Sequence, residues 1–314
     1  MSAVVRVYTG KRLADYSFGS SHPFGPYRHQ AFVDEFERRG LPARVQHGTP
    51  VMADQTQIGR FHDHDYIEMV KLASSRGSGY LDGGDTPAFP GVYEAACTVV
   101  GTALDALKSI MTGRCERAFV PIAGLHHARR NGAAGFCVFN DCGVVIETLR
   151  MQYGIKRVAY VDIDAHHGDG VFYGFESDPD LCFVDLHEDG RYLYPGTGRA
   201  DERGIGDAEG TKLNIPMSPE SNDKAFRQAW FRAEEFIDQF APDFIIMQCG
   251  ADSLQGDPLT HLAYTDESHG YAARQLSRLA DKHCSKRLLA LGGGGYNAEN
   301  LASAWCAVVE SLLN

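Results

Sequence analysis

The chain has 314 residues, of which 44% are hydrophobic, and its formal net charge at pH 7 is −11. This hydrophobic content is enough for a substantial core and excludes an intrinsically disordered protein. The acidic balance, without a long run of Lys and Arg, argues against a protein that binds the backbone of a nucleic acid directly.

The N-terminal sequence MSAVVRVYTGKRLADY lacks the charged segment and apolar core of a secretory leader. No uninterrupted apolar stretch is long enough to span a bilayer. The eight cysteines occur singly and form no CxxC pair, which is typical of reduced, buried thiols. We therefore expect a cytoplasmic protein without a membrane partner.

Short segments rich in apolar and β-branched residues alternate along the chain with longer segments of helical spacing. The pattern predicts strands within residues 117–124, 157–164, 181–187, 243–250 and 287–295. It predicts helices over residues 92–111, 141–153, 223–240 and 267–284. Continuous apolar strands between amphipathic helices indicate a doubly wound α/β fold, with a mostly parallel sheet and helices on both faces. No repeat or linker divides the sequence, so we expect a single domain over residues 1–314.

Polar side chains follow four of the predicted strands, at the point where each strand ends. In chain order they are His126 and His127, then Asp162, Asp164 and His166, then Asp252, and finally Tyr296. In an open parallel sheet, ligands bind beyond the carboxyl ends of the strands. The sequence therefore predicts that these distant segments form one site.

The segment YVDIDAHHGDG has the composition of a metal site. Asp162, Asp164 and His166 are spaced by two, so they point to one side of an extended chain. Carboxylates at a buried strand end need a compensating cation, and imidazole with carboxylates suits zinc, ferrous iron or manganese. Asp252 completes three ligands and leaves coordination open for water and substrate. Any one of these residues could instead be a structural cap, and His167 faces away and has no assigned role.

Paired histidines can provide the proton transfers that metal-assisted hydrolysis needs. His126 and His127 can act as base and acid if carboxylates hold them differently, and Asp162 and Asp169 are available for that purpose. Tyr296 follows four glycines and offers a phenol that can bind an oxyanion opposite the metal. The GGGG run could instead be a nucleotide loop, but the chain contains neither GxGxxG nor a Walker motif.

The chain resembles the zinc-dependent histone deacetylase family in six motifs that occur in fixed order: GLHHA, GFCVFND, YVDIDAHHGDG, YPGTG, GADSLQGDP and GGGGYN. This family includes bacterial acetoin-utilisation and acetylpolyamine amidohydrolase relatives. The resemblance extends from SHPFGPYR to GGGGYN and so covers nearly the whole chain. It implies the α/β architecture that these enzymes share with arginases.

The resemblance implies a role for each polar group at the strand ends. The implied zinc ligands are Asp164, His166 and Asp252. The implied catalytic residues are the tandem base and acid His126 and His127, their carboxylate partners Asp162 and Asp169, and the carbonyl-polarising Tyr296. The implied substrate-binding residues are the rim residue Asp85, the tunnel residues Gly135, Phe136, Tyr194 and Leu259, Gly294 in the four-glycine run, and Arg28 beside an internal cavity for acetate release.

The family also holds a structural potassium ion behind the zinc. Its implied ligands here are Asp162, Asp164, His166 and Asp185. At Asp185 the sequence departs from the family, whose members commonly have Ser there. A carboxylate at this position changes the geometry or the preference expected for the second ion.

The implied reaction is hydrolysis of an acetyl or short acyl amide, in which zinc polarises the carbonyl, His127 takes a proton and Tyr296 stabilises the oxyanion. The expected substrate is an acetylated lysine side chain or, alternatively, an acetylated polyamine or similar slender amine. A manganese ureohydrolase is less favoured, because Gly168 stands where a binuclear site needs Asp. A non-catalytic acyl-binding protein is also less favoured, because no catalytic group is missing. The sequence leaves the oligomeric state open, a homo-oligomer included.

Overall fold

The computed structural model describes residues 3–314 and contains an eight-stranded sheet in which every strand pairing is parallel. The strand order is β2-β1-β3-β8-β7-β4-β5-β6. The strands are β1 (Val5–Tyr8), β2 (Gln46–Gly48), β3 (Arg117–Val120), β4 (Val158–Asp162), β5 (Leu181–Glu188), β6 (Lys212–Met217), β7 (Phe244–Gln248) and β8 (Leu288–Leu291).

Helices make most of the connections between strands. The α-helices are α1 (Tyr27–Arg38), α2 (Gln55–Ile58), α3 (His64–Arg76), α4 (Val92–Met111), α5 (Asp141–Tyr153), α6 (Asp169–Gly174), α7 (Asp223–Phe240), α8 (Asp266–His283) and α9 (Ala298–Leu312). Three short 3-10 helices are η1 (Lys11–Asp15), η2 (Leu41–Arg44) and η3 (Gly206–Ala208). Across residues 3–314, we find no helix with the length and apolar character needed to cross a membrane.

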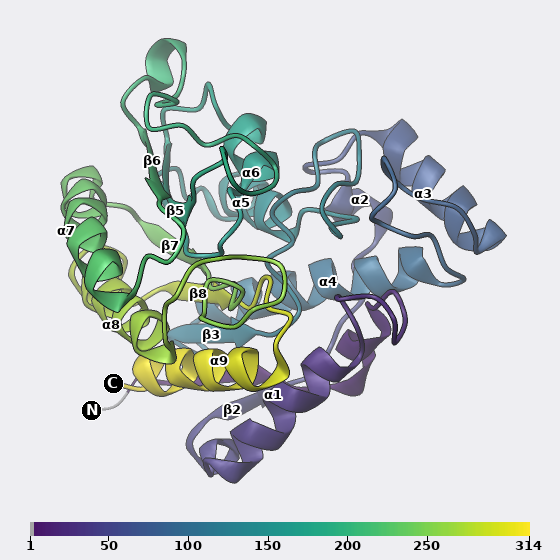
Figure 1. The fold of residues 1–314 in the computed structure, drawn as a ribbon, viewed down its shortest axis with the longest axis horizontal. Helices are drawn as coiled ribbons and strands as arrows, with labels where there is room; N and C mark the ends of the chain where they lie inside the picture. Colours follow the sequence, from purple (N-terminus) through teal and green to yellow (C-terminus); the bar gives the residue numbers. More distant parts are fainter. Residues whose placement is uncertain (1–2) are drawn as a thin grey trace.

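The helices cover both faces of the sheet. Every residue of β3, β4, β5, β7 and β8 is buried, and successive side chains of a strand point to opposite faces. Figure 1 shows α1 and α9 lying side by side, with α8 packed on both α9 and α7. A second group contains α4, which packs on α3 and α5. The predicted doubly wound α/β fold is therefore confirmed.

The four predicted helices correspond to α4, α5, α7 and α8 within one residue at each end. The five predicted strands correspond to β3, β4, β5, β7 and β8, but β3 and β8 end earlier than expected. Ile122 and Gly293, just beyond these two strands, have left-handed backbones with φ of 67° and 72°. The chain therefore leaves the sheet sooner, and the residues that follow become loops at its carboxyl edge.

Asn140 joins the start of α5 to the loop that carries the paired histidines. Its Oδ1 accepts the N–H of Gly143 at 2.8 Å, and its Nδ2 donates to the carbonyls of His126 and Ala128 at 3.2 and 2.9 Å. The backbone N–H of Asn140 donates to Nε2 of His62 at 2.8 Å. Because this Nε2 must keep its lone pair, the fold requires a neutral His62.

We expect acid to destabilise the fold through His62. Burial lowers its pKa to about 3, whereas His in an unfolded chain has a pKa of about 6.5. Between these values the unfolded state binds the extra proton, so the free energy of unfolding falls as the pH drops below about 6.5, by roughly 2 kcal/mol at about pH 5. His62→Gln, whose amide oxygen can still accept the Asn140 N–H, should flatten this decline. Urea unfolding of the parent and the variant across this pH range measures the free energy of unfolding of each. If this free energy fell equally with pH in both proteins, His62 would not contribute to the decline.

Candidate metal centre and catalytic groups

The candidate site lies at the carboxyl ends of four strands that are neighbours in the sheet, in the order β3-β8-β7-β4. The polar residues that follow these strands are, in the same order, His126 and His127, then Tyr296, then Asp252, and then Asp164 and His166. All four strands run in one direction, so their carboxyl ends share an edge of the sheet. This edge brings together groups that are far apart in the sequence.

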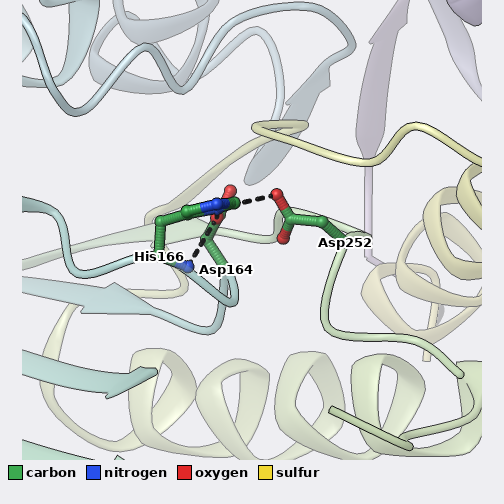
Figure 2. Close-up of side chains that lie close together, drawn as sticks. All are labelled: Asp164, His166 and Asp252. Carbon is green, nitrogen blue, oxygen red and sulfur yellow. Dashed lines mark hydrogen bonds and ion pairs between the residues drawn. The ribbon is translucent and has the colours of Figure 1, made fainter. Parts of the chain in front are cut away.

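Three side chains form a cluster that can hold a metal ion. Asp164, His166 and Asp252 each offer one ligand atom, and these atoms all lie within 4.8 Å of one another. Nδ1 of His166 lies 3.1 Å from Oδ1 of Asp164 and 3.2 Å from Oδ2 of Asp252, so the imidazole contacts both carboxylates (Figure 2). Within residues 3–314, no other three His, Cys, Asp or Glu side chains come together in this way.

The charges of the cluster fit a divalent cation. Burial and the nearby charge of Asp164 raise the pKa of Asp252 to about 7. Burial alone would lower the pKa of His166, but Asp164 and Asp252 raise it well above its ordinary value. Two buried carboxylates thus need positive charge between them, and one imidazole with two carboxylates is a suitable donor set for zinc or ferrous iron.

Two glycines allow the carboxylates of the cluster to lie against the backbone. A Cβ at Gly250 would be 1.9 Å from Oδ2 of Asp164, and a Cβ at Gly294 would be 2.1 Å from Oδ2 of Asp252. The N–H of Gly294 also donates to Oδ2 of Asp164 at 2.9 Å. The structure therefore places Gly294, which the resemblance implied as a substrate-binding residue, against the carboxylates of the cluster.

Gln248, the last residue of β7, supports the cluster and was not singled out by the sequence motifs. Its Nε2 donates to Oδ2 of Asp164 at 2.9 Å and to the carbonyl of Gly124 at 3.1 Å. Its Oε1 accepts the N–H of Gly250 at 2.7 Å. The signal in the sequence is a single amide that ends the otherwise apolar strand FIIMQ.

Gln248→Leu should weaken metal binding about 10- to 100-fold, because the Asp164 carboxylate loses a bond that orients it. Competition with a chromophoric chelator measures the affinity. Melting of the metal-free variant is the control for lost packing. An unchanged metal affinity would mean that Asp164 is oriented without Gln248.

The paired histidines are held by separate carboxylates. Nδ1 of His126 lies 2.8 Å from Oδ2 of Asp162, and Nδ1 of His127 lies 2.7 Å from Oδ1 of Asp169. The two Nε2 atoms are 3.1 Å apart. The structure thus brings together the His and Asp partners that the sequence predicted, and the two Nε2 atoms lie within hydrogen-bond distance of each other.

The two imidazoles differ in charge. Burial would lower the pKa of His126, but the carboxylates of Asp162 and Asp164 raise it to about 10. Burial and the positive charge of His126 lower the pKa of His127 to about 4. His127 is therefore the neutral member of the pair, and its Nε2 can accept a proton.

Tyr296 is close enough to the cluster to respond to its charge. Burial and the charge of Asp252 raise the pKa of Tyr296 well above its ordinary value, so the phenol keeps its proton. Its N–H donates to Oδ2 of Asp257 at 2.8 Å, and its carbonyl accepts from the Tyr27 hydroxyl at 2.9 Å. Neither Asp257 nor Tyr27 was singled out from the sequence, because each acts on the backbone of another residue.

Arg28 supports the four-glycine loop from inside the protein. The buried guanidinium donates from Nε to the carbonyl of Gly295 at 2.8 Å and from Nη2 to the carbonyl of Gly293 at 2.6 Å. Its central carbon lies 4.0 Å from the centroid of the Phe24 ring. These contacts fix the loop before Tyr296, and the implied role of Arg28 in acetate release stays a prediction.

Gly135, Phe136 and Tyr194 lie beside the candidate catalytic groups His127 and Tyr296. The rings of Tyr194 and His127 meet edge-on with centroids 5.2 Å apart, and those of Phe136 and Tyr296 do so at 5.8 Å. A Cβ at Gly135 would be 2.5 Å from Cδ2 of His127 and 3.1 Å from Cε1 of Tyr194. Only glycine fits this position, between an aromatic residue and a histidine.

Asp85 and Leu259 lie further out. Asp85 is exposed, and its carbonyl accepts from Nε2 of His22 at 3.2 Å. The His22 ring in turn meets Phe136 with centroids 4.6 Å apart. Leu259 donates its N–H at 2.9 Å to Oδ1 of Asp257, the residue that also holds Tyr296.

Asp185 is the residue at which the sequence departs from the pattern that the resemblance implied. Its Oδ1 lies 2.7 Å from Nδ1 of His187, and its Oδ2 accepts the N–H of Gly168 at 2.8 Å. Asp162 and Asp185 are register partners in β4 and β5. Both oxygens of Asp185 are thus engaged, and the potassium site stays a prediction. The His167 ring lies tilted against that of His187, with centroids 4.9 Å apart, and His167 takes no part in the candidate metal cluster.

Known proteins are similar to this chain in both sequence and fold. Residues 22–312 match the family model described as Histone deacetylase domain. The chain is 38% identical over 302 residues to the acetoin utilization protein AcuC of Bacillus subtilis (strain 168), covering 93% of this chain and 78% of that protein. It is 32% identical over 323 residues to the protein of the same name in Staphylococcus aureus (strain MRSA252), covering 100% of this chain and 82% of that protein. The crystal structure of the HDA15 HD domain matches with a TM-score of 0.92 and 29% identity, covering 99% of this chain and 88% of that chain.

Proposed function

Because the chain belongs to the histone deacetylase family and so is a deacetylase, we propose that it hydrolyses an acetyl or short acyl amide on a slender amine stem. The observation that carries this proposal is the cluster of Asp164, His166 and Asp252 beside the histidine pair, with Nε2 of His126 4.0 Å from Oδ1 of Asp164. A base beside a divalent-ion site is the arrangement that activates water for attack on a carbonyl.

We propose zinc as the resident metal, with ferrous iron as the alternative, held by Asp164, His166 and Asp252. When bound, the metal would supply a Lewis acid that polarises the acyl carbonyl and acidifies the attacking water. All other roles in the reaction belong to side chains of this chain.

The histidine pair moves the protons. His127 donates its Nδ1–H to Asp169, so its Nε2 carries the lone pair that accepts a proton from water. Nε2 of His126, 3.1 Å away, holds the proton that the leaving amine needs. The water oxygen bonds to the acyl carbon, the C–N bond breaks, the amine leaves with a proton, and acetate is released.

Tyr296 stabilises the charge that develops on the acyl oxygen. Its phenol keeps its proton and can donate a hydrogen bond to that oxygen. Asp257 and Tyr27 bind the backbone on either side of its Cα. The phenol is thereby held ready before the substrate arrives.

The two aromatic side chains beside the catalytic groups favour a slender substrate. Phe136 and Tyr194 can bury a chain of methylene groups, and Asp85 at the rim can bind N–H donors of the substrate. We assign an acetylated lysine side chain as the substrate, with an acetylated polyamine as the alternative.

The chain is assigned as one catalytic domain, since one sheet extends through it and α1 packs on α9.

A panel of substrates, with protein loaded with zinc or with ferrous iron, tests these assignments. Acetate release from an acetyl-lysine peptide supports the proposal, and faster release from N-acetylputrescine or N-acetylspermidine would move the assignment to polyamines. Urea release from agmatine would support a ureohydrolase, which needs two metal ions, whereas residues 3–314 contain one cluster of three candidate ligands. Binding of the acetylated compounds without turnover would support the acyl-binding protein.

A further inference from the structure

Phe136 has a backbone conformation that aromatic residues rarely adopt. Its φ is 66° and that of Gly135 is 52°, both in the left-handed region. This region is unfavourable for a residue with a bulky side chain, and it persists only where the surrounding structure fixes it. Contacts on both sides of Phe136 must therefore hold its peptide groups.

Two hydroxyl groups from distant parts of the chain provide these contacts. The N–H of Phe136 donates to Oγ1 of Thr86 at 3.1 Å, and its carbonyl accepts from the hydroxyl of Tyr16 at 2.7 Å. The Tyr16 oxygen also accepts the N–H of Val138 at 2.9 Å. Thr86 and Tyr16 are only 0% and 1% exposed, so water cannot readily replace either hydroxyl.

Thr86 is itself fixed by the turn that carries Asp85. Oδ1 of Asp82 accepts the N–H groups of Gly84, Asp85 and Thr86 at 3.0, 3.1 and 3.0 Å. Oδ2 of Asp82 accepts the hydroxyl of Thr86. Because the hydroxyl proton points to Asp82, the oxygen presents a lone pair to the N–H of Phe136. The turn at residues 82–86 and the backbone of Phe136 thus form one hydrogen-bonded unit, although 50 residues separate Thr86 from Phe136.

The position of Phe136 affects the approach to the catalytic phenol. Its ring meets the ring of Tyr296 edge-on at 5.8 Å and that of His22 at 4.6 Å. A shift of the Phe136 backbone therefore changes the distance between the Phe136 and Tyr296 rings. The Phe136 ring is one of the two aromatic rings, with that of Tyr194, to which we assigned the burial of the substrate stem.

We propose that Thr86 is a positioning residue that sets the width of the substrate passage by fixing Phe136, and that it thereby selects slender, unbranched acyl-amine stems. Thr86 acts through Phe136 and does not touch the substrate. The inference rests on the proposed deacetylase function.

The test compares Thr86→Val with Thr86→Ser in the metal-loaded protein. Val keeps the shape of Thr but removes the hydroxyl oxygen that accepts the Phe136 N–H, so KM for an acetyl-lysine peptide should rise about 10-fold with kcat within about three-fold. Ser keeps the hydroxyl and should restore KM. The matched control is Thr98→Val, which removes a buried hydroxyl that donates to the Glu94 carbonyl within α4 at 2.8 Å and should leave KM unchanged.

A double variant shows whether Thr86 acts through Phe136. In a Phe136→Ala protein, Thr86→Val should raise KM no further. The inference would be overturned if Thr86→Val left KM unchanged or lowered only kcat. It would also be overturned if Thr86→Val raised KM as much in the Phe136→Ala protein as in the parent. If Thr86→Val does not fold, Tyr16→Phe, which removes the other hydroxyl, should give the same rise in KM, and an unchanged KM there would overturn it.

The inference and the proposed function can fail separately. A parent protein inactive on the whole substrate panel defeats the proposed function. In that case a crystal structure of Thr86→Val decides the positioning role. A displaced Phe136 supports it, and Phe136 unmoved with a positive φ overturns it.

Discussion

Tyr296→Phe should lower turnover of the acetylated substrate about 10²- to 10³-fold while the protein keeps its metal. The change removes the one donor that we assign to the acyl oxygen. It does not alter Asp164, His166 or Asp252, the assigned metal ligands. It also leaves the backbone bonds to Asp257 and Tyr27 in place, because these involve only the N–H and carbonyl of residue 296. Steady-state kinetics together with metal analysis measures both parts of this expectation.

Tyr264→Phe provides the matched control. Tyr264 is 1% exposed, and its hydroxyl has no hydrogen-bond partner among the described residues. Removing that hydroxyl also changes a buried Tyr to Phe, but it breaks no hydrogen bond to the assigned catalytic groups, so turnover should not change. If Tyr296→Phe retained full turnover, the phenol would have no part in the reaction.

Apolar patterning predicted the centre of the sheet better than its edges. β3, β4, β5, β7 and β8 are buried on both faces and are therefore nearly continuous apolar runs. The edge strands are different. β2 has only three residues and two of them are exposed, while β6, KLNIPM, contains Lys, Asn and Pro. Pro is tolerated at an edge because a missing N–H there breaks no pairing within the sheet, and such a sequence does not follow a strand pattern.

The assigned metal and proton-transfer groups could be predicted from the sequence for a physical reason. Parallel strands place their carboxyl ends together, so polar residues at each strand end could be grouped before their distances were known. The bond between Asp169 and His127 joins two such segments at 2.7 Å.

The supporting residues could not be found in this way. Tyr27 binds the carbonyl of Tyr296 across 269 positions of sequence, and Thr86 binds the N–H of Phe136 across 50. These bonds involve main-chain atoms, which every residue has. The side chain of the residue whose backbone is bound therefore does not indicate that the bond exists. Gln248 was accessible in principle, because an amide at the end of an apolar strand needs a buried partner.

Asp252→Asn should reduce turnover at least about 10³-fold, to the background rate, and should also remove tight metal binding. Asn has nearly the shape of Asp but lacks the charge, so the cluster keeps its outline and loses one of its two anionic ligands. The result therefore differs in kind from Tyr296→Phe, which is expected to lose turnover alone.

Stability without metal provides the control for this variant. In the metal-free protein, burial and the charge of Asp164 raise the pKa of Asp252 to about 7, above the unfolded value of about 3.9. A raised carboxyl pKa means that ionised Asp252 costs stability, and this cost grows as the pH rises from about 3.9 to about 7. Metal-free Asp252→Asn should therefore melt no lower than the metal-free parent at pH 8. Added zinc should raise the melting temperature of the parent far more than that of the variant, because only tight binding to the folded state shifts the equilibrium. If the variant bound zinc as tightly as the parent, Asp252 would not be a ligand, and the metal centre would have to be built from other groups.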